Sequence, residues 1–306
     1  MTVSDSPLLS VVIPAYNYAR VLPRAVESVL SQAGDDVELW VVDDGSSDDT
    51  PAVFEALAAR HGERFRGVRQ DNAGPSAARN HGVRLAGGRH VLLLDADDEL
   101  VPGMLPRLCE QLRAEPDIGL WLAGHVAVQP DGREREHPAS PLPDGIAERL
   151  SAYLLDKTIA ISHGACLFRR DLLLQRPYPE HLRHSEDIPV FAYALAHGPV
   201  RRLDFSLARV HKHSGSLRHN AEAARKVDLK LVDEVFDRLP AAAQALRHRY
   251  KAQRCLSLFR TCMLAGDQDG ARYYYGEALR VDWRVLFKFS YSRKALRLWL
   301  GAKKSV

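Results

Sequence analysis

Apolar runs and amphipathic segments alternate through the N-terminal part of the chain, and this order restricts the fold more than any other feature. Runs expected to form strands occur at residues 9–14, 37–42, 65–69 and 90–94. Segments in which apolar residues recur with helical spacing lie between them, at 20–32, 51–61 and 76–87. Strands that alternate with helices of about ten residues indicate crossover units and a parallel sheet covered on both faces. We therefore expect an α/β domain.

Chemically informative residues come directly after three of these strands, at 14–17, 43–47 and 95–98. In open α/β sheets, ligands bind beyond the carboxyl ends of the strands. The three clusters are therefore expected to line one binding site.

The acidic cluster after the run at 90–94 has the pattern of a metal site. Asp95 and Asp97 are separated by one residue, so both carboxylates can point into one pocket. Mg²⁺ and Mn²⁺ prefer such oxygen ligands and usually share them with substrate phosphates. The alternative is that Asp98 caps a helix beginning near Glu99 while the other acids are solvated, but the apolar strand before them favours the metal site.

Three further polar clusters have both a functional and a structural interpretation. Asp43 and Asp44 could accept hydrogen bonds from a base or a ribose, or could belong to a simple turn. Glu186-Asp187 contains a carboxylate that could act as a general base, although exposed acidic pairs are common. Residues 211–216 combine two histidines, a lysine and two serines, which suit a metal and phosphate oxygens but also a surface loop.

Four motifs succeed one another along the chain, as VVIPAYN at 11–17, VVDDGSSDDT at 41–50, NAGPSAARN at 72–80 and LDADD at 94–98. In this order they resemble the catalytic domain of family 2 glycosyltransferases. The resemblance is close over residues 8–105, and it is looser to about 217, through motifs at 164–169, 185–187 and 211–216. It implies a GT-A-like, Rossmann-type mixed sheet flanked by helices. It also implies an inverting enzyme that takes a sugar from a nucleotide-sugar donor.

The resemblance assigns the donor nucleotide to particular residues. Those implied to contact it are Pro14, Ala15, Tyr16, Asn17, Asp44, Gly74, Arg79, Asp95 and Ala96. Tyr16 would pack on the nucleobase, Asp44 would accept a hydrogen bond from it, and Asp95 would face the ribose and diphosphate. The base bound by this family is typically uracil, so a UDP-sugar is the expected donor.

The resemblance also implies a metal-dependent single displacement. Asp97 would hold a Mn²⁺ or Mg²⁺ ion, and His213 would complete the metal site. The ion would stabilise the charge that grows on the departing diphosphate. Asp187 would be the catalytic base, with Glu186 beside it. Ile188-Pro189 replace the aromatic or acidic residue that often comes next, and proline constrains the backbone before it, so the position of Asp187 could differ slightly.

The pattern changes along the rest of the chain. Residues 1–219 are expected to form the catalytic domain, which includes a strand at 118–128. Residues 129–145 are rich in proline and charge and predict an exposed loop, with a helix after it near 146–156. Residues 220–306 are expected to form a helical C-terminal region, because alanine, leucine and arginine recur at spacings of three and four.

The C-terminal end is basic and aromatic, with no acidic residue after Asp282. Its basic residues are Arg284, Lys288, Arg293, Lys294, Arg297, Lys303 and Lys304. The aromatic residues between them are Trp283, Phe287, Phe289, Tyr291 and Trp299. A helix of this kind suits an anionic membrane surface, which residues 284–306 would contact. The alternative is a helix that packs its aromatic side chains on the catalytic domain.

Composition restricts the function and the compartment. Lys plus Arg is 42 and Asp plus Glu is 39, so the net charge of +3 argues against nucleic acid as a partner. The four cysteines form no C-x-x-C pair and are expected to be reduced. No signal peptide or membrane-spanning run is expected. We therefore expect a cytoplasmic enzyme, with a peripheral position on the inner face of the cytoplasmic membrane if the C-terminal end binds lipid. Its acceptor would be a glycan or a lipid-linked glycan of the cell surface.

Other functional classes fit less well. A non-enzymatic nucleotide-binding regulator, the main alternative, would not need Asp187 or a metal. A phospho-receiver domain is much shorter than this chain of 306 residues. A dinucleotide-dependent oxidoreductase would show G-x-G-x-x-G after its first strand, and this sequence does not.

Overall fold

Two compact units make up the computed structural model, which describes residues 6–182, 184–212 and 229–301. The first unit consists of Met1–Leu142, Thr158–His181 and Tyr193–Ser216. The second consists of Pro143–Lys157, Leu182–Ala192 and Leu217–Val306. The second unit thus joins two segments from the region expected to be catalytic to the C-terminal helices. The boundary expected at 219/220 lies outside the described residues.

Nine strands, counted over the described residues, form one mixed sheet in the first unit. They are β1 (Leu9–Ala15), β2 (Val37–Asp43), β3 (Arg66–Arg69), β4 (His90–Leu93), β5 (Glu99–Leu100), β6 (Leu120–Val128), β7 (Glu134–His137), β8 (Cys166–Arg169) and β9 (Val200–His211). Their order is β3-β2-β1-β4-β8-β6-β9-β5, and β7 pairs with β6. The first four strands in this order are parallel, whereas β8 runs antiparallel to both β4 and β6. The mixed sheet implied by the family resemblance is therefore confirmed.

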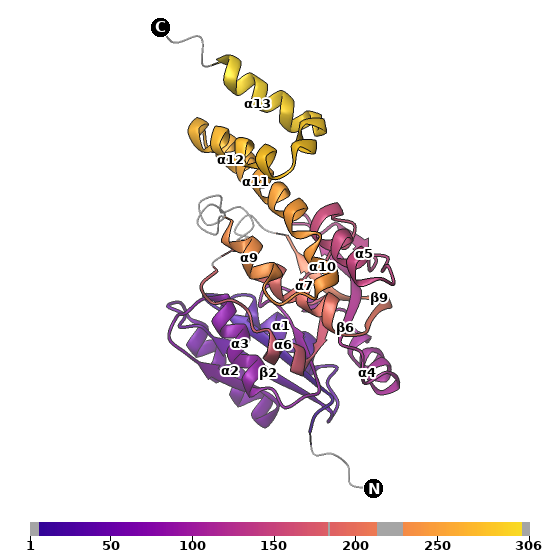
Figure 1. Cartoon of the computed structure of the whole chain (residues 1–306). Coiled ribbons are helices and arrows are strands. Elements are labelled where there is room, and N and C mark those ends of the chain that lie inside the picture. Colours follow the sequence, from indigo (N-terminus) through magenta and orange to yellow (C-terminus); the bar gives the residue numbers. More distant parts are fainter. Residues whose placement is uncertain (1–5, 183, 213–228, 302–306) are drawn as a thin grey trace. The chain divides into compact units, whose positions relative to one another are not determined.

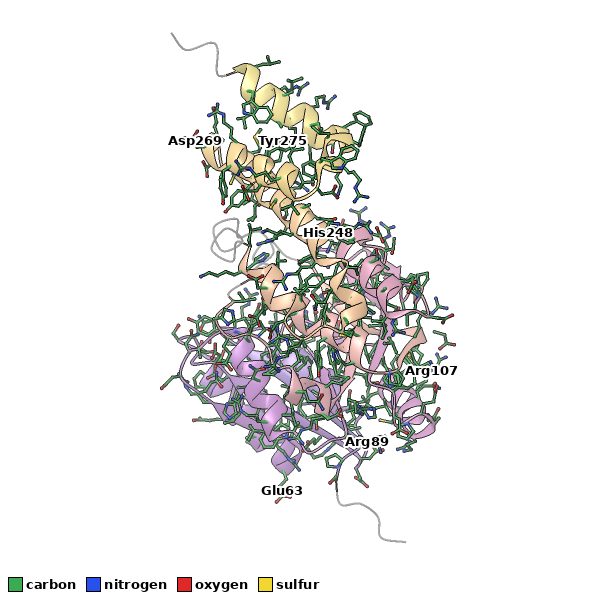
Figure 2. The ribbon with its side chains drawn as sticks, viewed as in Figure 1. Glu63, Arg89, Arg107, His248, Asp269 and Tyr275 are labelled. Atoms are coloured by element: carbon green, nitrogen blue, oxygen red, sulfur yellow. The ribbon has the colours of Figure 1, made fainter. Side chains whose placement is uncertain are left out.

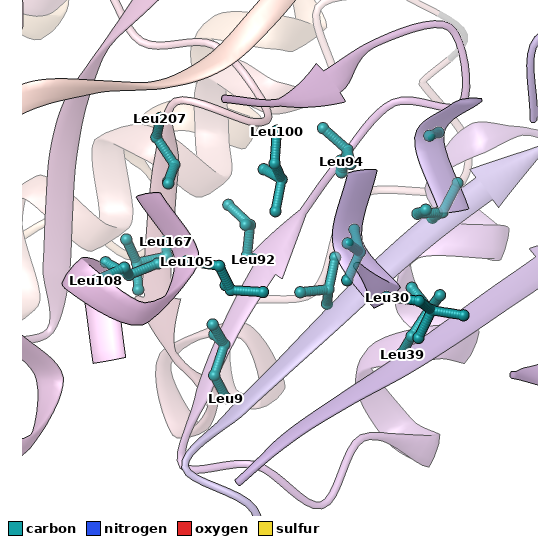
Figure 3. Close-up of a cluster of buried hydrophobic side chains, with 14 of the residues drawn as sticks. Leu9, Leu30, Leu39, Leu92, Leu94, Leu100, Leu105, Leu108, Leu167 and Leu207 are labelled. Carbon is teal, nitrogen blue, oxygen red and sulfur yellow. The ribbon is translucent and has the colours of Figure 1, made fainter. Parts of the chain in front are cut away.

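Helices pack on both faces of the parallel strands (Figure 1). Those of the first unit are α1 (Leu22–Leu30), α2 (Thr50–His61), the short 3-10 helix η1 (Gly62–Arg64), α3 (Pro75–Leu85), α4 (Met104–Ala114) and α6 (Arg170–Gln175). Leu9 and Leu92 point into the core that α1 covers, as Figure 3 shows. Val12 faces the other way, so close to Gly82 of α3 that a Cβ at that glycine would lie 2.2 Å from the valine side chain. Burial on both faces explains why these strands are apolar throughout rather than alternating.

Three features of the first unit differ from the sequence-based expectations. The segment expected to be an exposed loop contains β7, which is mostly exposed and forms by pairing with β6. The strand β9 was not foreseen, although it pairs with β6 over most of its length. The alternative in which Asp98 caps a helix is wrong, because residues 99–100 form β5 and α4 begins at Met104.

The second unit is helical among its described residues. Its elements are α5 (Ile146–Ser151), the π-helix η2 (Ala152–Asp156), α9 (Lys230–Phe236), α10 (Ala241–Gln244), α11 (Arg247–Leu264), α12 (Gln268–Val281), the 3-10 helix η4 (Trp283–Phe287) and α13 (Phe289–Gly301), and α7 (Asp187–His197) begins here and ends in the first unit. Asp267 caps α12 by accepting a hydrogen bond from the Gly270 N–H. Tyr275, labelled in Figure 2, donates to Ser292 Oγ over 2.9 Å and meets Trp299 edge-on, which attaches α13 to α12. In the described part of the chain, no helix combines the length and hydrophobicity that crossing a membrane requires.

Candidate active site

The segments after β1 and β2 are joined by Asn17. Its backbone N–H donates to Ser46 Oγ over 2.8 Å, and its Oδ1 accepts from the Ser47 N–H, also over 2.8 Å. Asn17 has a φ of 59°, a left-handed conformation that asparagine tolerates better than most residues. The turn leaves the neighbouring Tyr16 46% exposed, so its ring is available to stack on a ligand. Asn17 therefore positions two loops at the end of the sheet where ligands bind.

Asp44 organises the loop that leads into α3. Its carboxylate accepts hydrogen bonds from Gln70 Nε2 (2.7 Å) and from the backbone N–H groups of Ala73 (3.0 Å) and Gly74 (2.8 Å). The residue is only 3% exposed, and the three donors compensate its charge for the hydration lost on burial. The structure thus shows Asp44 holding the 70–74 loop in place, while its contact with a nucleobase stays a prediction.

Asp95, two residues beyond the end of β4, lies between two buried side chains. Arg79 Nη2 of α3 is 3.0 Å from Asp95 Oδ1, and His163 Nδ1 is 3.9 Å from Asp95 Oδ2. Tyr178 supports both partners, because its hydroxyl is 2.9 Å from His163 Nε2 and its ring lies beneath the Arg79 guanidinium. The N–H of residue 164 donates to the carbonyl oxygen of residue 93, which fixes the segment carrying His163 beside the end of β4. Asp95 is thus held in one orientation by cationic and polar neighbours.

Asp97 contacts residues of the segment after β1. Tyr18 lies 3.5 Å from Asp97 Oδ2 through its hydroxyl oxygen, and the Arg24 guanidinium donates to the Asp97 carbonyl oxygen. Burial, reinforced by the charge of Asp97, raises the pKa of Tyr18 to about 12, so its hydroxyl stays protonated and can donate. Ala96 is buried between the two acids, whereas Asp95 and Asp97 are both partly exposed.

Asp98 is buried behind these acids. Its Oδ1 accepts from the His211 N–H over 2.9 Å, and His211 Nε2 lies 2.9 Å from Glu99 Oε1. Burial, together with the negative charges of Asp95 and Asp97, raises the pKa of Asp98 to about 8. Asp95 and Asp97 thus place negative charge beside Asp98, and a cation at these acids would offset it.

The acidic cluster supplies the oxygen ligands that a divalent cation prefers. Asp95 and Asp97 are both partly exposed at the sheet edge, which suits an ion that also coordinates a diphosphate. The described residues contain no group of three or more His, Cys, Asp or Glu side chains placed to hold a metal by themselves. The predicted third ligand, His213, lies outside the described residues. The residues present thus fit a cation shared with a substrate.

Glu186 and Asp187 belong to the second unit, whereas the residues described above belong to the first. Asp187 lies in the first turn of α7, where the helix dipole favours negative charge. Pro189 lies in the same turn, where its missing N–H costs no helical hydrogen bond. Burial lowers the pKa of Lys157, and the negative charge of the nearby Asp187 carboxylate partly raises this pKa again. Asp187 therefore lies within electrostatic reach of a cation of its own unit.

Residues 10–176 match the sequence profile of the family described as glycosyl transferase family 2. The match covers more than half of the chain. This protein belongs to glycosyltransferase family 2.

Relatives of this family 2 glycosyltransferase differ in how much of their length it covers. The succinoglycan biosynthesis protein ExoO of Rhizobium meliloti is 33% identical over 261 residues, which are 79% of this chain and 72% of that protein. An uncharacterized glycosyltransferase of Nostoc sp. is 39% identical over 112 residues, which are 37% of this chain and 35% of that protein. The chain therefore spans about a third of the length of the Nostoc relative.

Solved structures show the same fold. The crystal structure of S. aureus TarS 1-349 in complex with UDP-GlcNAc has a TM-score of 0.67 and 22% sequence identity to this glycosyltransferase. The alignment covers 89% of this chain and 81% of that one. The GT-A-like architecture implied by the sequence is therefore shown.

The structure of this glycosyltransferase adds residues that sequence motifs did not identify. Tyr18 and Arg24 contact Asp97, His163 lies beside Asp95, and Tyr178 supports His163. His163 directly precedes the recognised motif at 164–169, and that position was a usable signal. Tyr178 had none, because only the folded chain brings it to Arg79.

Proposed function

We propose that this glycosyltransferase moves a sugar from a UDP-sugar to a hydroxyl group of a glycan or lipid-linked acceptor, with inversion at the anomeric carbon. The observation that carries the proposal is that Asp95 and Asp97, both partly exposed, follow the parallel strand β4, with Arg79 holding Asp95. A structural neighbour solved with UDP-GlcNAc supports the donor, and a relative named for succinoglycan biosynthesis supports the pathway class. The acceptor is accordingly assigned to cell-surface polysaccharide synthesis.

The donor side is built from the loops at the sheet edge. Tyr16, held out by the Asn17 turn, stacks on the uracil ring. Asp44 keeps the 70–74 loop in position and accepts from the base at its remaining lone pairs. Asp95, oriented by Arg79, faces the ribose and the diphosphate.

A divalent cation fits the same edge. Asp97 would hold it, with His213 as a further ligand, and Mn²⁺ or Mg²⁺ there would offset the negative charge of the leaving diphosphate. Tyr18 and Arg24 fix the backbone and the carboxylate of Asp97, so that the ligand is positioned before the donor binds.

The acceptor hydroxyl reacts in a single in-line step. Its oxygen attacks the anomeric carbon, the bond from that carbon to the phosphate oxygen breaks, and UDP leaves with the bonding electrons. Asp187 takes the hydroxyl proton, and Glu186 stands beside it. Asp187 lies in the first turn of α7, where the helix dipole favours a negative charge on its carboxylate.

A panel of nucleotide-sugars tests the donor proposal. The melting temperature of the full chain is measured with UDP-, GDP-, ADP- and dTDP-sugars, with and without Mn²⁺. We expect a UDP-sugar to stabilise the protein, and more strongly when Mn²⁺ is present, because ligands that bind only the folded state raise stability. Stabilisation only by a sugar linked to a nucleotide other than UDP would contradict the UDP assignment. Equal stabilisation in the presence of EDTA would contradict the role of a cation in donor binding.

We also propose that the C-terminal elements rest on an anionic membrane surface, on the inner face of the cytoplasmic membrane. In α13, Tyr291, Ala295 and Leu298 face the core of the second unit. Phe289 and Leu300 point elsewhere, with exposed fractions of 78% and 62%.

The outward face continues beyond α13. Phe289, Leu296 and Leu300 are separated by seven and four residues, so they share one side of the helix. The adjoining η4 exposes Trp283, Leu286 and Phe287. Arg293 and Arg297 lie near this apolar face and are also exposed. An apolar stripe beside cations is complementary to anionic lipid, and it would bring a lipid-linked acceptor to the enzyme.

A further inference from the structure

The second unit contains a pocket of about 520 Å³ bordered by η2, α11 and η4. Pockets that bind small ligands span roughly 300–1,000 Å³, so this one can hold a sugar unit. The buried side chains of Leu155, Ala252 and Val285 supply its apolar part. Such surfaces suit the C–H face of a sugar ring.

Three cationic side chains line the pocket, namely Arg249, Arg284 and Lys288. Arg284 is fixed by Asp282, whose Oδ1 lies 3.1 Å from Arg284 Nε and also accepts from the Arg284 N–H. That ion pair uses the Nε–H of the Arg284 guanidinium and leaves its terminal N–H groups for other partners. Arg249 and Lys288 form no ion pair with any residue in the described ranges. The pocket therefore offers more positive charge than its own carboxylates neutralise.

Two polar groups of the pocket suit hydroxyl groups rather than anions. Gln253 Nε2 donates to Leu155 O over 3.0 Å, which fixes the amide and directs its Oε1 away from that bond. Asp156 accepts from Ser151 Oγ over 2.9 Å and keeps free lone pairs on its exposed carboxylate. A ligand with hydroxyl donors and one anionic group would satisfy both sets of partners.

The pocket and the proposed base belong to the same unit, and residues 156–157 link the two. Asp156 lines the pocket, and the next residue, Lys157, lies in the field of Asp187. Lys157 has a φ of 58°, so the chain turns sharply between the two positions. An acceptor chain bound in the pocket would thus lie against the segment that also faces Asp187.

We propose that this pocket binds an acidic sugar unit of the acceptor glycan, bearing a carboxylate or a phosphate, with Arg249 and Lys288 holding the anion. The proposal rests on the acceptor being a glycan, as argued above. It names the substrate class more closely, because cations without an ion-pair partner in the described ranges favour an anionic sugar over a neutral one.

Binding of short carbohydrates to the full chain, without donor, tests the proposal. The probes are tri-galacturonate for a carboxylate, glucose 6-phosphate for a phosphate, and neutral maltotriose, each titrated and followed by protein NMR. We expect one of the acidic probes to bind in preference to maltotriose. Arg249→Ala and Lys288→Ala should each weaken that binding by about tenfold or more, because a charge-assisted hydrogen bond is lost.

Matched controls separate the pocket from general charge. Arg260→Ala removes an exposed arginine from the same helix, and Lys294→Ala an exposed lysine from α13, so both should leave binding unchanged. Equal losses of probe binding in all four variants would overturn the proposal, and so would a wild type that binds acidic probes no better than maltotriose. The proposal would also fail if Arg249→Ala and Lys288→Ala weakened only the binding to anionic vesicles and left probe binding intact. UDP-sugar binding is measured on the same samples. Its absence from the wild type would refute the proposed function without affecting the probe result.

Discussion

Arg79 of α3 and Asp95 at the end of β4 form an ion pair in which Nη2 lies 3.0 Å from Oδ1. Arg79 is buried whereas Asp95 is partly exposed, so the carboxylate is anchored from behind and open in front. Tyr178 supports the arginine from its ring face. The pair thus connects the loop that Asp44 organises to the acidic cluster at the sheet edge.

Replacing Arg79 with methionine should weaken donor binding more than it weakens the fold. The variant keeps an aliphatic side chain against Tyr178 but frees Asp95 to rotate. Solvent can hydrate the partly exposed Asp95, so we expect a loss of roughly 1–2 kcal/mol in the free energy of unfolding. Calorimetric titration with the UDP-sugar and urea unfolding measure the two effects. Arg84→Met, an exposed change on the same helix, should affect neither, and an Arg79 variant that binds donor normally would contradict the positioning of Asp95.

Asp97→Asn should abolish sugar transfer and the metal-dependent part of donor binding while the protein stays folded. The amide cannot supply the charge that a hard cation requires. Transfer to acceptor and Mn²⁺-dependent stabilisation are the readouts, with circular dichroism as the check on folding. Full activity of the variant, or wild-type activity undiminished in excess EDTA, would exclude the metal ligand role.

Asp187→Asn should separate chemistry from donor binding. A base acts on the acceptor, so nucleotide and metal binding should stay close to wild type. Turnover should fall by roughly two to four orders of magnitude, the usual effect of losing a positioned acid or base. Glu186→Gln is the internal control, with a smaller expected loss. If Asp187→Asn instead weakened nucleotide binding and spared turnover at saturation, the residue would belong to the donor site.

Acid should destabilise the fold through His90. This residue is fully buried in β4, and burial, with a smaller contribution from the charge of Arg89, lowers its pKa from 6.5 to about 4. The unfolded chain therefore binds a proton below pH 6.5 that the folded chain does not bind until about pH 4. Stability is complete above the unfolded pKa and falls as the pH drops through this window, by up to about 3 kcal/mol. Urea unfolding at several pH values measures the slope, which His90→Gln should flatten and the exposed His248→Gln should not.

Removing the exposed apolar stripe of α13 should release the protein from anionic vesicles. The variant Phe289→Ser, Leu296→Ser, Leu300→Ser leaves the packed residues Tyr291 and Ala295 in place, so the second unit should keep its melting temperature. Sedimentation with anionic and neutral vesicles, at low and high salt, is compared for the wild type, this variant and a chain truncated after residue 283. Equal behaviour of all three would show that the tail does not bind membrane. A wild type that dimerises through this face without binding vesicles would also refute the proposal.

Local sequence patterns determined much of the first unit. The apolar runs that became β1, β2 and β4 are buried on both faces, and their composition alone marks them as interior strands. The helices between them were recognisable by a different pattern, since each must bury one stripe of apolar residues that recur with helical spacing. The acidic residues after β4 were identifiable as a site because a parallel strand delivers the residues at its carboxyl end to the binding edge.

Tertiary structure alone decided the remaining contacts. The charged segment 134–137 has no apolar alternation and becomes β7 only because β6 supplies hydrogen-bond partners. His163 reaches Asp95 from far along the chain, through the position of β8 beside β4, and Tyr178 reaches His163 and Arg79. In α13 the sequence shows aromatic residues but not their partners, and packing against α12 buries Ala295 while leaving Phe289 exposed. Propensity and periodicity act between near neighbours in sequence, whereas these contacts depend on which distant surfaces the folded chain brings together.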